Sequence, residues 1–237
     1  MSDACKWLHE QFERAPLVRY PFDLSELPKN GIYAFYEDGE TWGHSEQRPR
    51  IVRIGTHKQG NFRSRIREHY LLDERKMRFD ASKPAPHERS IFRKNIGRAL
   101  LNRDHDPYLD IWEIDYTTSA ARRERGYLRD IAKERALEAE ITSILRTTFS
   151  FRYLVVEDQA KRVGANGLES ALIGTVAGCR ECEPSSHWLG LYSPVAKIRA
   201  SGMWLYQHVD ATGIVEQHRE GILSALADTQ VWLQTAH

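Results

Sequence analysis

The sequence predicts an α/β (α+β) protein in which helices flank a small, mostly antiparallel central sheet. Two segments rich in the branched and aromatic residues typical of strands, residues 31–36 and 50–54, are separated by a turn-rich segment, as in a hairpin. A third such segment, residues 149–158, comes much later, and amphipathic helical patterns fill much of the remaining chain. The sequence shows no internal repeat, so we expect one sheet with several helices.

The composition is that of a soluble globular protein. The chain has 237 residues, of which 41% are apolar and 28% charged, enough for one large domain with a sizeable core. No stretch approaches the roughly 20 apolar residues of a membrane helix, and the first residues lack the apolar segment of a secretory signal. Three cysteines are too few for a disulfide framework, so we expect a cytoplasmic, reducing location.

Further helices and strands can be assigned from apolar periodicity. Residues 61–75 fit a helix capped by Asn61, with Phe62, Ile66 and Tyr70 on one stripe. Residues 108–116 nearly alternate in polarity and predict a strand. The remaining helices are expected at residues 4–14, 89–103, 119–147, 167–178 and 214–234.

The charge is unevenly distributed along a nearly neutral chain. The formal net charge is only +1, so composition alone does not indicate nucleic acid. Residues 48–103, however, contain far more Arg and Lys than Asp and Glu. This excess fits a phosphate-binding face or a solvated surface balanced by acids elsewhere.

Four short sequence features occur in a specific order along the chain. Gly31-Ile32-Tyr33 lies on the first strand, Arg53-Ile54-Gly55 ends the second, and the following helix carries Arg65 and His69. Glu169 opens an apolar helix soon after the third strand. This order, over roughly residues 28–175, resembles the GIY-YIG nuclease superfamily, in particular an uncharacterised bacterial branch that is similar to its restriction-enzyme-like members. Arg53 stands where the second motif has tyrosine.

The resemblance implies the organisation of the chain. We expect an N-terminal helix and lead-in at residues 1–27. A GIY-YIG-like core with a helical insertion would follow at residues 28–190, and a C-terminal helical extension packed on that core at residues 191–237.

The resemblance also implies a DNA endonuclease that hydrolyses phosphodiester bonds with one Mg²⁺ or Mn²⁺ ion. Tyr33 would act as the base, Arg65 as the phosphate clamp and Glu169 as the metal ligand. Guanidinium groups can donate two hydrogen bonds to one phosphate, and Mg²⁺ prefers oxygen ligands. His69 lies one helical turn after Arg65, so both can act on one face, and His57 is a second histidine candidate.

Each candidate also has a structural interpretation. Tyr33 fits a core tyrosine with a satisfied hydroxyl, Arg65 a solvated helix arginine, and His69 a capping or surface histidine. Glu138 is the rival metal ligand, but its charged neighbours favour a solvated helix face.

DNA contacts are expected from five basic residues: Arg53, Lys58, Arg63, Lys197 and Arg199. Trp188, Trp204 and Tyr206 lie in the same segment as the last two and could stack on bases, although core packing is favoured.

The pair Cys179 and Cys182 forms a single CxxC. Zinc usually takes four ligands, so His187 and the distant Cys5 would have to complete a site, and two unpaired thiols are the favoured interpretation.

Two alternatives to an endonuclease remain. The same fold could bind DNA with little or no turnover, which Arg53 in place of tyrosine supports, or the aromatic C-terminal region could serve association with a partner. No membrane contact is expected, and restriction, repair and mobile-element roles and the oligomeric state stay open.

Overall fold

A four-stranded antiparallel sheet forms the centre of the computed structural model, which describes residues 2–43, 45–164 and 167–235. Its strands are β1 (Leu17–Arg19), β2 (Gly31–Trp42), β3 (Ser45–Gly55) and β4 (Phe149–Val155), in the spatial order β1-β4-β2-β3. Every neighbouring pair runs antiparallel. The predicted fold class is therefore confirmed, and β3 is an edge strand of the sheet.

The hairpin of β2 and β3 is longer than the sequence predicts. The segment expected to be a turn-rich connection continues as strand to Trp42 and resumes at Ser45. Its polar residues are accommodated by an ion pair inside the structure: Arg50 donates from Nε and Nη2 to one Glu40 oxygen, at 2.9 and 2.7 Å, and both side chains are buried. Pairing removes much of the cost of burying each charge.

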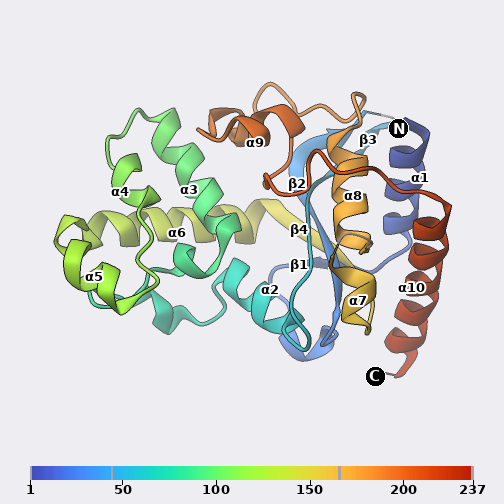
Figure 1. Cartoon of the computed structure of the whole chain (residues 1–237), viewed down its shortest axis with the longest axis horizontal. Coiled ribbons are helices and arrows are strands. Elements are labelled where there is room, and N and C mark those ends of the chain that lie inside the picture. Colours follow the sequence, from blue (N-terminus) through green and yellow to red (C-terminus); the bar gives the residue numbers. More distant parts are fainter. Residues whose placement is uncertain (1, 44, 165–166, 236–237) are drawn as a thin grey trace.

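Helices cover both faces of this sheet. In Figure 1, α3 to α6 lie on one side of the strands, and α1, α8 and α10 lie on the other, with α8 beside β3. None of the described helices is long and apolar enough to cross a membrane. The helices are α1 (Ser2–Glu13), α2 (Phe62–Tyr70), α3 (Ile91–Arg103), α4 (Leu109–Glu113), α5 (Ser119–Arg125), α6 (Ile131–Thr148), α7 (Gln159–Arg162), α8 (Leu168–Ala177), α9 (Ala196–Ser201) and α10 (Glu216–Thr235).

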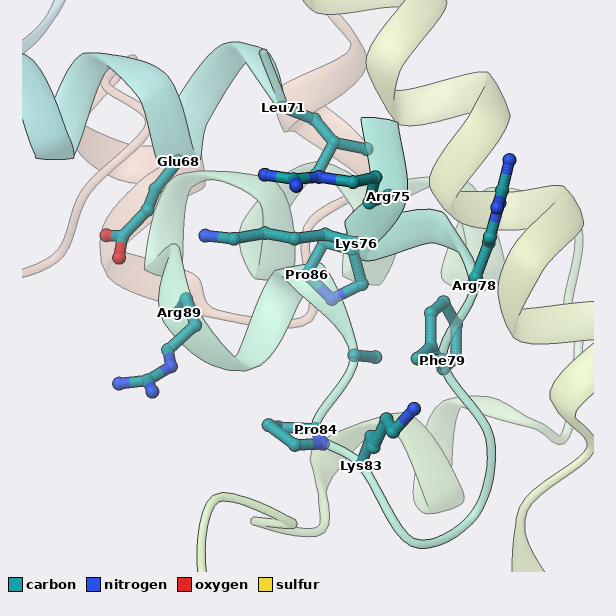
Figure 2. A pocket seen from close by; sticks show the side chains of 11 residues that line it. Glu68, Leu71, Arg75, Lys76, Arg78, Phe79, Lys83, Pro84, Pro86 and Arg89 are labelled. Carbon is teal, nitrogen blue, oxygen red and sulfur yellow. The ribbon is translucent and has the colours of Figure 1, made fainter. Parts of the chain in front are cut away.

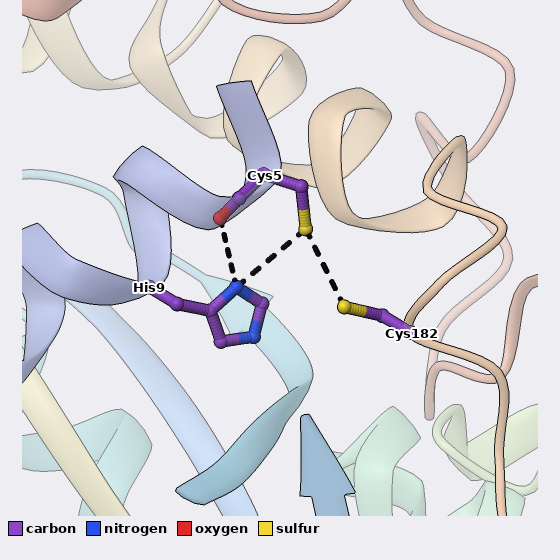
Figure 3. A group of neighbouring side chains, drawn as sticks. All are labelled: Cys5, His9 and Cys182. Carbon is purple, nitrogen blue, oxygen red and sulfur yellow. Dashed lines mark hydrogen bonds between the residues drawn. The ribbon is translucent and has the colours of Figure 1, made fainter. Parts of the chain in front are cut away.

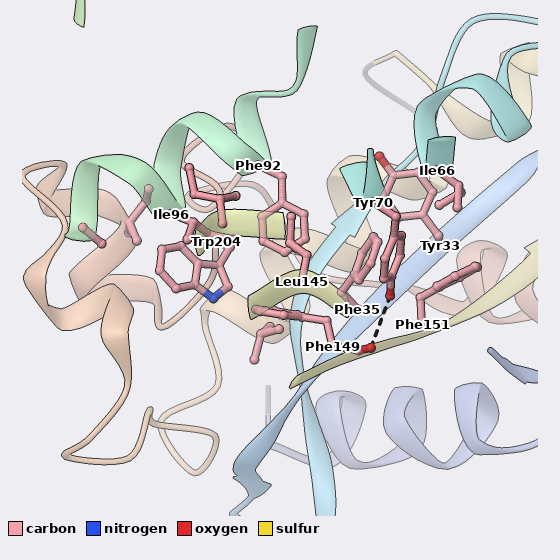
Figure 4. Packing of buried hydrophobic residues seen from close by; sticks show 14 of the residues in the cluster. Tyr33, Phe35, Ile66, Tyr70, Phe92, Ile96, Leu145, Phe149, Phe151 and Trp204 are labelled. Carbon is pink, nitrogen blue, oxygen red and sulfur yellow. Dashed lines mark hydrogen bonds between the residues drawn. The ribbon is translucent and has the colours of Figure 1, made fainter. Parts of the chain in front are cut away.

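Alternation along β2 separates two apolar clusters. Tyr33 and Phe35 belong to the cluster under α2, α3 and α6, whereas Ile32, Ala34 and Tyr36 belong to the cluster under α1, α8 and α10. Such alternation follows from the two-residue repeat of a strand. In the first cluster the Phe35 ring is surrounded by other aromatic rings (Figure 4). Tyr33 is thus held by packing on the face where Arg53 and Gly55, its neighbours across the hairpin, also lie.

The predicted strand at residues 108–116 is wrong, because this segment contains the short helix α4. Its Trp112 stacks on the His87 ring, with centroids 3.6 Å apart, and donates from Nε1 to the Lys94 carbonyl oxygen at 3.1 Å. Gly97 leaves room for the indole, since a Cβ there would lie 2.4 Å from Trp112. Tertiary packing therefore overrides the apparent alternation.

The long helix predicted at residues 119–147 is also wrong in extent. Helix α5 ends at Arg125, a 3₁₀ turn follows at Gly126–Leu128, and α6 begins at Ile131. Asp130 starts α6 because its carboxylate accepts from the Lys133 N–H at 3.0 Å. Asn61 does precede α2, but its side chain makes no capping hydrogen bond.

Candidate active site

The candidate site lies where β3 ends at the sheet edge. Tyr33 is opposite Gly55 in the hairpin register, and a Cβ on Gly55 would lie 2.5 Å from the Tyr33 hydroxyl oxygen. The next residue, Thr56, donates its backbone N–H to Glu169 Oε1 at 3.1 Å. The absence of a side chain at Gly55 therefore leaves room for the Tyr33 phenol, and the backbone N–H of Thr56 holds the Glu169 carboxylate.

A hydrogen-bonded chain of three buried side chains contains the Tyr33 hydroxyl. His69 Nε2 lies 3.1 Å from this hydroxyl, and His69 Nδ1 lies 2.8 Å from Ser90 Oγ. Ser90 Oγ accepts from the Arg93 N–H at 3.3 Å, so its own hydrogen needs another acceptor, and His69 Nδ1 is the one that the described residues offer. This assignment places the imidazole proton on Nε2, which donates to the phenol.

Charged groups act on the Tyr33 phenol from several sides. Burial raises its pKa, and the positive charges of Arg53 and Arg65 oppose that rise, as does a hydrogen bond from Arg53. The negative charge of Glu169 raises the pKa further. Burial also lowers the pKa of His69 well below its usual value, so that His69 is neutral near pH 7. Tyr33 therefore interacts electrostatically with Arg65 and Glu169, and its hydroxyl is hydrogen-bonded to His69.

Glu169 lies in the first turn of α8, on the wall of a pocket of about 310 Å³. Arg53, Asn95, Tyr206 and His208 also line this pocket. Burial raises the pKa of Glu169, while the Thr56 N–H and nearby cationic side chains oppose that rise. Because Oε1 accepts from Thr56, the second oxygen can serve a cation, and a single carboxylate in a polar pocket fits the chemistry of Mg²⁺, which keeps several waters.

Arg53 is buried rather than extended into solvent. Its guanidinium donates from Nη1 to the Trp204 carbonyl oxygen and lies over the Phe92 ring, 4.8 Å from the centroid. Burial lowers the pKa of Arg53, and the Tyr33 phenol opposes that effect. The residue at the position of the motif tyrosine therefore interacts electrostatically with Tyr33.

Arg65 lies at the margin of the site, with 32% of its side chain exposed. Its Nη1 donates to Glu68 Oε2 at 2.7 Å and to the Arg89 carbonyl oxygen at 3.1 Å. The remaining guanidinium N–H groups can bind an anion, whereas Nη1 is paired with Glu68, whose side chain is only 16% exposed.

His57 uses both ring nitrogens in backbone hydrogen bonds. Nε2 accepts from the Gly31 N–H at 3.1 Å, so Nδ1 carries the proton and donates to the Lys58 carbonyl oxygen. Burial lowers the pKa of His57 to about 4. The structure thus places His57 as a link between the start of β2 and the loop after β3.

The expected solvated face at Glu138 is wrong. Glu138 is fully buried and accepts from Arg93 Nη2 at 2.5 Å and from His87 Nδ1 at 2.9 Å. Burial alone would raise its pKa, but Arg93 and His87 outweigh burial and lower the pKa to about 2. Both carboxylate oxygens are bonded to cationic or N–H groups, so Glu138 is an ion-pair residue of the core.

A basic cavity of about 390 Å³ lies near Arg65. In Figure 2 the cationic ends of Arg75 and Lys76 extend toward Glu68, and Arg89 lies on the same side of the cavity. Lys83 and Arg78 also contribute to the lining. Part of the basic excess of residues 48–103 is therefore gathered into one concave surface, and Arg89 joins that surface to Arg65.

The other expected DNA contacts have mixed environments. Lys58 is exposed, whereas Arg63 is partly buried and donates to the carbonyl oxygens of Leu27 and Ser25. Lys197 forms an exposed ion pair with Asp210, and the exposed Arg199 donates to the Ser193 carbonyl oxygen.

Core packing of the C-terminal tryptophans is confirmed. Trp188 and Trp204 are 2% and 0% exposed, and both donate from Nε1 to Glu37 Oε2, at 2.9 and 2.8 Å. Of the three aromatics named from this segment, only Tyr206 lines the pocket with Glu169.

Three residues of the site were missed in the sequence. Ser90 positions His69, while His208 and Arg162 act electrostatically on Glu169. Ser90 directly precedes an apolar helical pattern, which is the usual signal of a helix cap, so the cap could have been found but not its bond to His69. No local sequence signal connects the other two to the site.

A comparison with family models finds that the GIY-YIG domain matches residues 8–230. The chain therefore belongs to the GIY-YIG family, whose members are nucleases. Searches among curated proteins and among solved structures returned no match.

Proposed function

We propose that this protein is a divalent-metal-dependent DNA endonuclease that uses Tyr33 as base, Arg65 as phosphate clamp and Glu169 as metal ligand. One observation carries this proposal. The Tyr33 hydroxyl packs against Gly55, the next backbone N–H holds Glu169, and His69 bonds the same hydroxyl from the other side. A proton acceptor, a carboxylate and cationic side chains thus share one end of the hairpin.

Tyr33 would remove a proton from the attacking water. A phenol with a raised pKa is a weak base at neutral pH, so it needs groups that favour phenolate. The structure supplies a donated N–H from neutral His69 and the nearby charge of Arg53. In this chain Arg53 therefore takes a supporting role at the position of the second tyrosine.

Arg65 would bind the scissile phosphate as charge builds on it. Its partner Glu68 comes from the same helix, three residues on, and would have to release part of the guanidinium when a phosphate approaches. Loss of one transition-state donor of this kind typically costs about 2.7–4 kcal/mol, or roughly 10²–10³ in rate.

Glu169 would hold the metal through its carboxylate, with water and phosphate oxygens as the other ligands. When bound, Mg²⁺ or Mn²⁺ supplies Lewis-acid stabilisation of the phosphate and of the departing 3′ oxygen. His57 would position the strand ends rather than move protons, since both of its ring nitrogens are engaged.

DNA would approach along the basic cavity. Arg75, Lys76, Lys83 and Arg89 line it around an apolar floor, and Lys58 is exposed on the loop after β3. Contacts from Lys197 and Arg199 remain part of the proposal, because both side chains are exposed on α9. Phosphate contacts of this kind bind without reading sequence.

The test is cleavage of supercoiled plasmid by the full chain in MgCl₂, compared with Glu169→Ala and with Glu220→Gln, which alters an exposed glutamate of α10. Wild type and Glu220→Gln should nick the plasmid, and chelation with EDTA should stop them. Equal nicking by Glu169→Ala would refute the proposed metal site.

A second candidate is a DNA-binding module of the same fold with little or no turnover. The observation that favours it is the burial of Tyr33, which is only 2% exposed and whose pKa is raised. DNA binding by wild type without cleavage in Mg²⁺ or Mn²⁺, over supercoiled, linear and branched substrates, would favour this candidate over the endonuclease.

A further inference from the structure

The three cysteines of the chain come together in a buried cluster far from Tyr33 in the fold. Cys5 on α1 and Cys182 in the turn after α8 lie with their sulfur atoms 3.7 Å apart, and Cys179 packs in the same buried cluster. His9 is next to Cys5, whereas His187, which the sequence suggested as a ligand, is exposed outside the cluster. The cysteines form no disulfide, and the distant Cys5 packs with Cys179 and Cys182.

We propose that the sulfur atoms of Cys5, Cys179 and Cys182 bind one zinc ion, with a water molecule as the fourth ligand that zinc takes and His9 as a positioning residue for Cys5. This site is separate from the proposed magnesium site, and its role is to join α1 to the end of α8. Each thiol gives up its proton as its sulfur bonds to the metal, so binding releases protons to solvent.

The spacing of the donor atoms fits zinc. A tetrahedral ion with Zn–S bonds of about 2.3 Å places neighbouring sulfur atoms about 3.8 Å apart. The observed separation of Cys5 and Cys182 is 3.7 Å, and the ligand atoms of Cys5, His9 and Cys182 all lie within 4.8 Å of one another. A disulfide needs about 2.05 Å between its sulfur atoms, and the three cysteines are not joined by a disulfide in the structure.

The protonation of His9 decides its role. Its Nε2 accepts from the Ile51 backbone N–H at 3.1 Å, so the neutral ring carries its proton on Nδ1. Figure 3 shows Nδ1 facing Cys5, at 3.0 Å from the carbonyl oxygen and 3.5 Å from the sulfur. An N–H directed at the sulfur orients it and stabilises the thiolate, as hydrogen-bond partners of metal ligands commonly do. A direct Nδ1–zinc bond would move the ring proton of the neutral histidine to Nε2. The Nε2–H group would then face the Ile51 N–H, which is also a donor.

The surroundings of the cluster suit a buried site. Cys5 is 0% exposed, and Trp42 packs against the three cysteines. The CxxC segment turns tightly, with the Cys182 N–H donating to the Cys179 carbonyl oxygen at 3.4 Å.

The three cysteine side chains pack together in a buried cluster, so deprotonated sulfur atoms there would repel one another. Three buried thiolates would require a positive ion to compensate their charge, and a soft d¹⁰ dication is the ion that thiolates prefer.

The first experiment measures zinc by elemental analysis in the full chain purified under reducing conditions. We expect about one zinc per chain in wild type and in the control His187→Ala, and less than a tenth of that in Cys182→Ser. His9→Gln should still bind zinc, but about 10–100-fold more weakly in competition with a chelator.

A second measurement does not depend on the variants folding. Wild type is stripped of metal in denaturant and chelator, refolded with reductant, and titrated with Co²⁺ and then Zn²⁺. One equivalent of Co²⁺ should give sulfur-to-cobalt charge-transfer absorption that Zn²⁺ abolishes, and zinc should raise the melting temperature.

Wild type that contains no zinc and takes up neither ion after reduction would overturn the proposal. Loss of zinc binding in His187→Ala would also overturn it.

Discussion

Substitution of Gly55 by alanine perturbs the proposed base directly. The added methyl group would lie 2.5 Å from the Tyr33 hydroxyl oxygen and 2.7 Å from two ring carbons. Favourable contact needs about 3.5 Å, so the ring has to move by roughly 1 Å. Tyr33 is packed against Phe35, Phe62 and His69, which leaves it little room.

The expected cost has two parts. Overpacking of a tight core typically costs about 1–3 kcal/mol of stability. A misplacement of about 1 Å at a reacting group typically costs about 10² in rate. We therefore expect a folded Gly55→Ala protein that melts at a lower temperature and cleaves DNA about 100-fold more slowly.

The assay compares initial rates of plasmid nicking in Mg²⁺ with thermal unfolding followed by circular dichroism. Gly221→Ala is the matched control, since a Cβ there meets Leu168 at an ordinary 3.5 Å and alanine favours the helix. A Gly55→Ala enzyme with the wild-type rate would show that the position of the Tyr33 hydroxyl does not matter, and would refute the reasoning.

Four further predictions concern other parts of the structure. Glu138→Gln should lower the free energy of unfolding in urea by about 3–5 kcal/mol, because it leaves Arg93 buried without its charge partner; a loss below 1 kcal/mol would contradict this. The pKa of Glu138 is lowered from 4.5 to about 2, so its contribution is complete above pH 4.5 and is lost as pH falls toward 2; wild-type urea curves should show that decline, and Glu138→Gln a smaller one. His69→Leu should slow cleavage at least about tenfold through loss of the hydrogen bond to Tyr33, and an unchanged rate would remove His69 from the site. Lys76→Ala with Lys83→Ala should reduce the slope of log affinity for DNA against log salt by about 1.8, and an unchanged slope would exclude the cavity as a phosphate contact.

The sequence predicts most of the elements that carry the site, because their signals are local. The apolar stripe of Phe62, Ile66 and Tyr70 marks α2, and all three side chains are buried as expected. The helix that bears Glu169 is equally clear, since α8 covers Leu168–Ala177 of the predicted residues 167–178 and has an apolar inner face. Period and capping depend only on neighbours in the chain, so they can be read without coordinates.

Errors arose where a distant partner decides the environment. Glu138 has charged neighbours in sequence, but Arg93, 45 residues earlier, makes its burial possible. The cysteine cluster could not be predicted for the same reason. His9 and Cys5 are one helical turn apart, but Cys182, which contacts Cys5, is 177 residues away from it in the sequence. Such pairings depend on the tertiary fold, and local propensity carries no record of them.

The central claim is that Glu169 holds the metal beside Tyr33, and anomalous diffraction from crystals soaked in MnCl₂ tests it most directly. The account predicts a manganese peak bonded to the Glu169 carboxylate in the pocket that Arg53 lines, and no such peak in Glu169→Ala crystals. An ordered manganese ion elsewhere, with none at Glu169 in an enzyme that cleaves DNA, would contradict it.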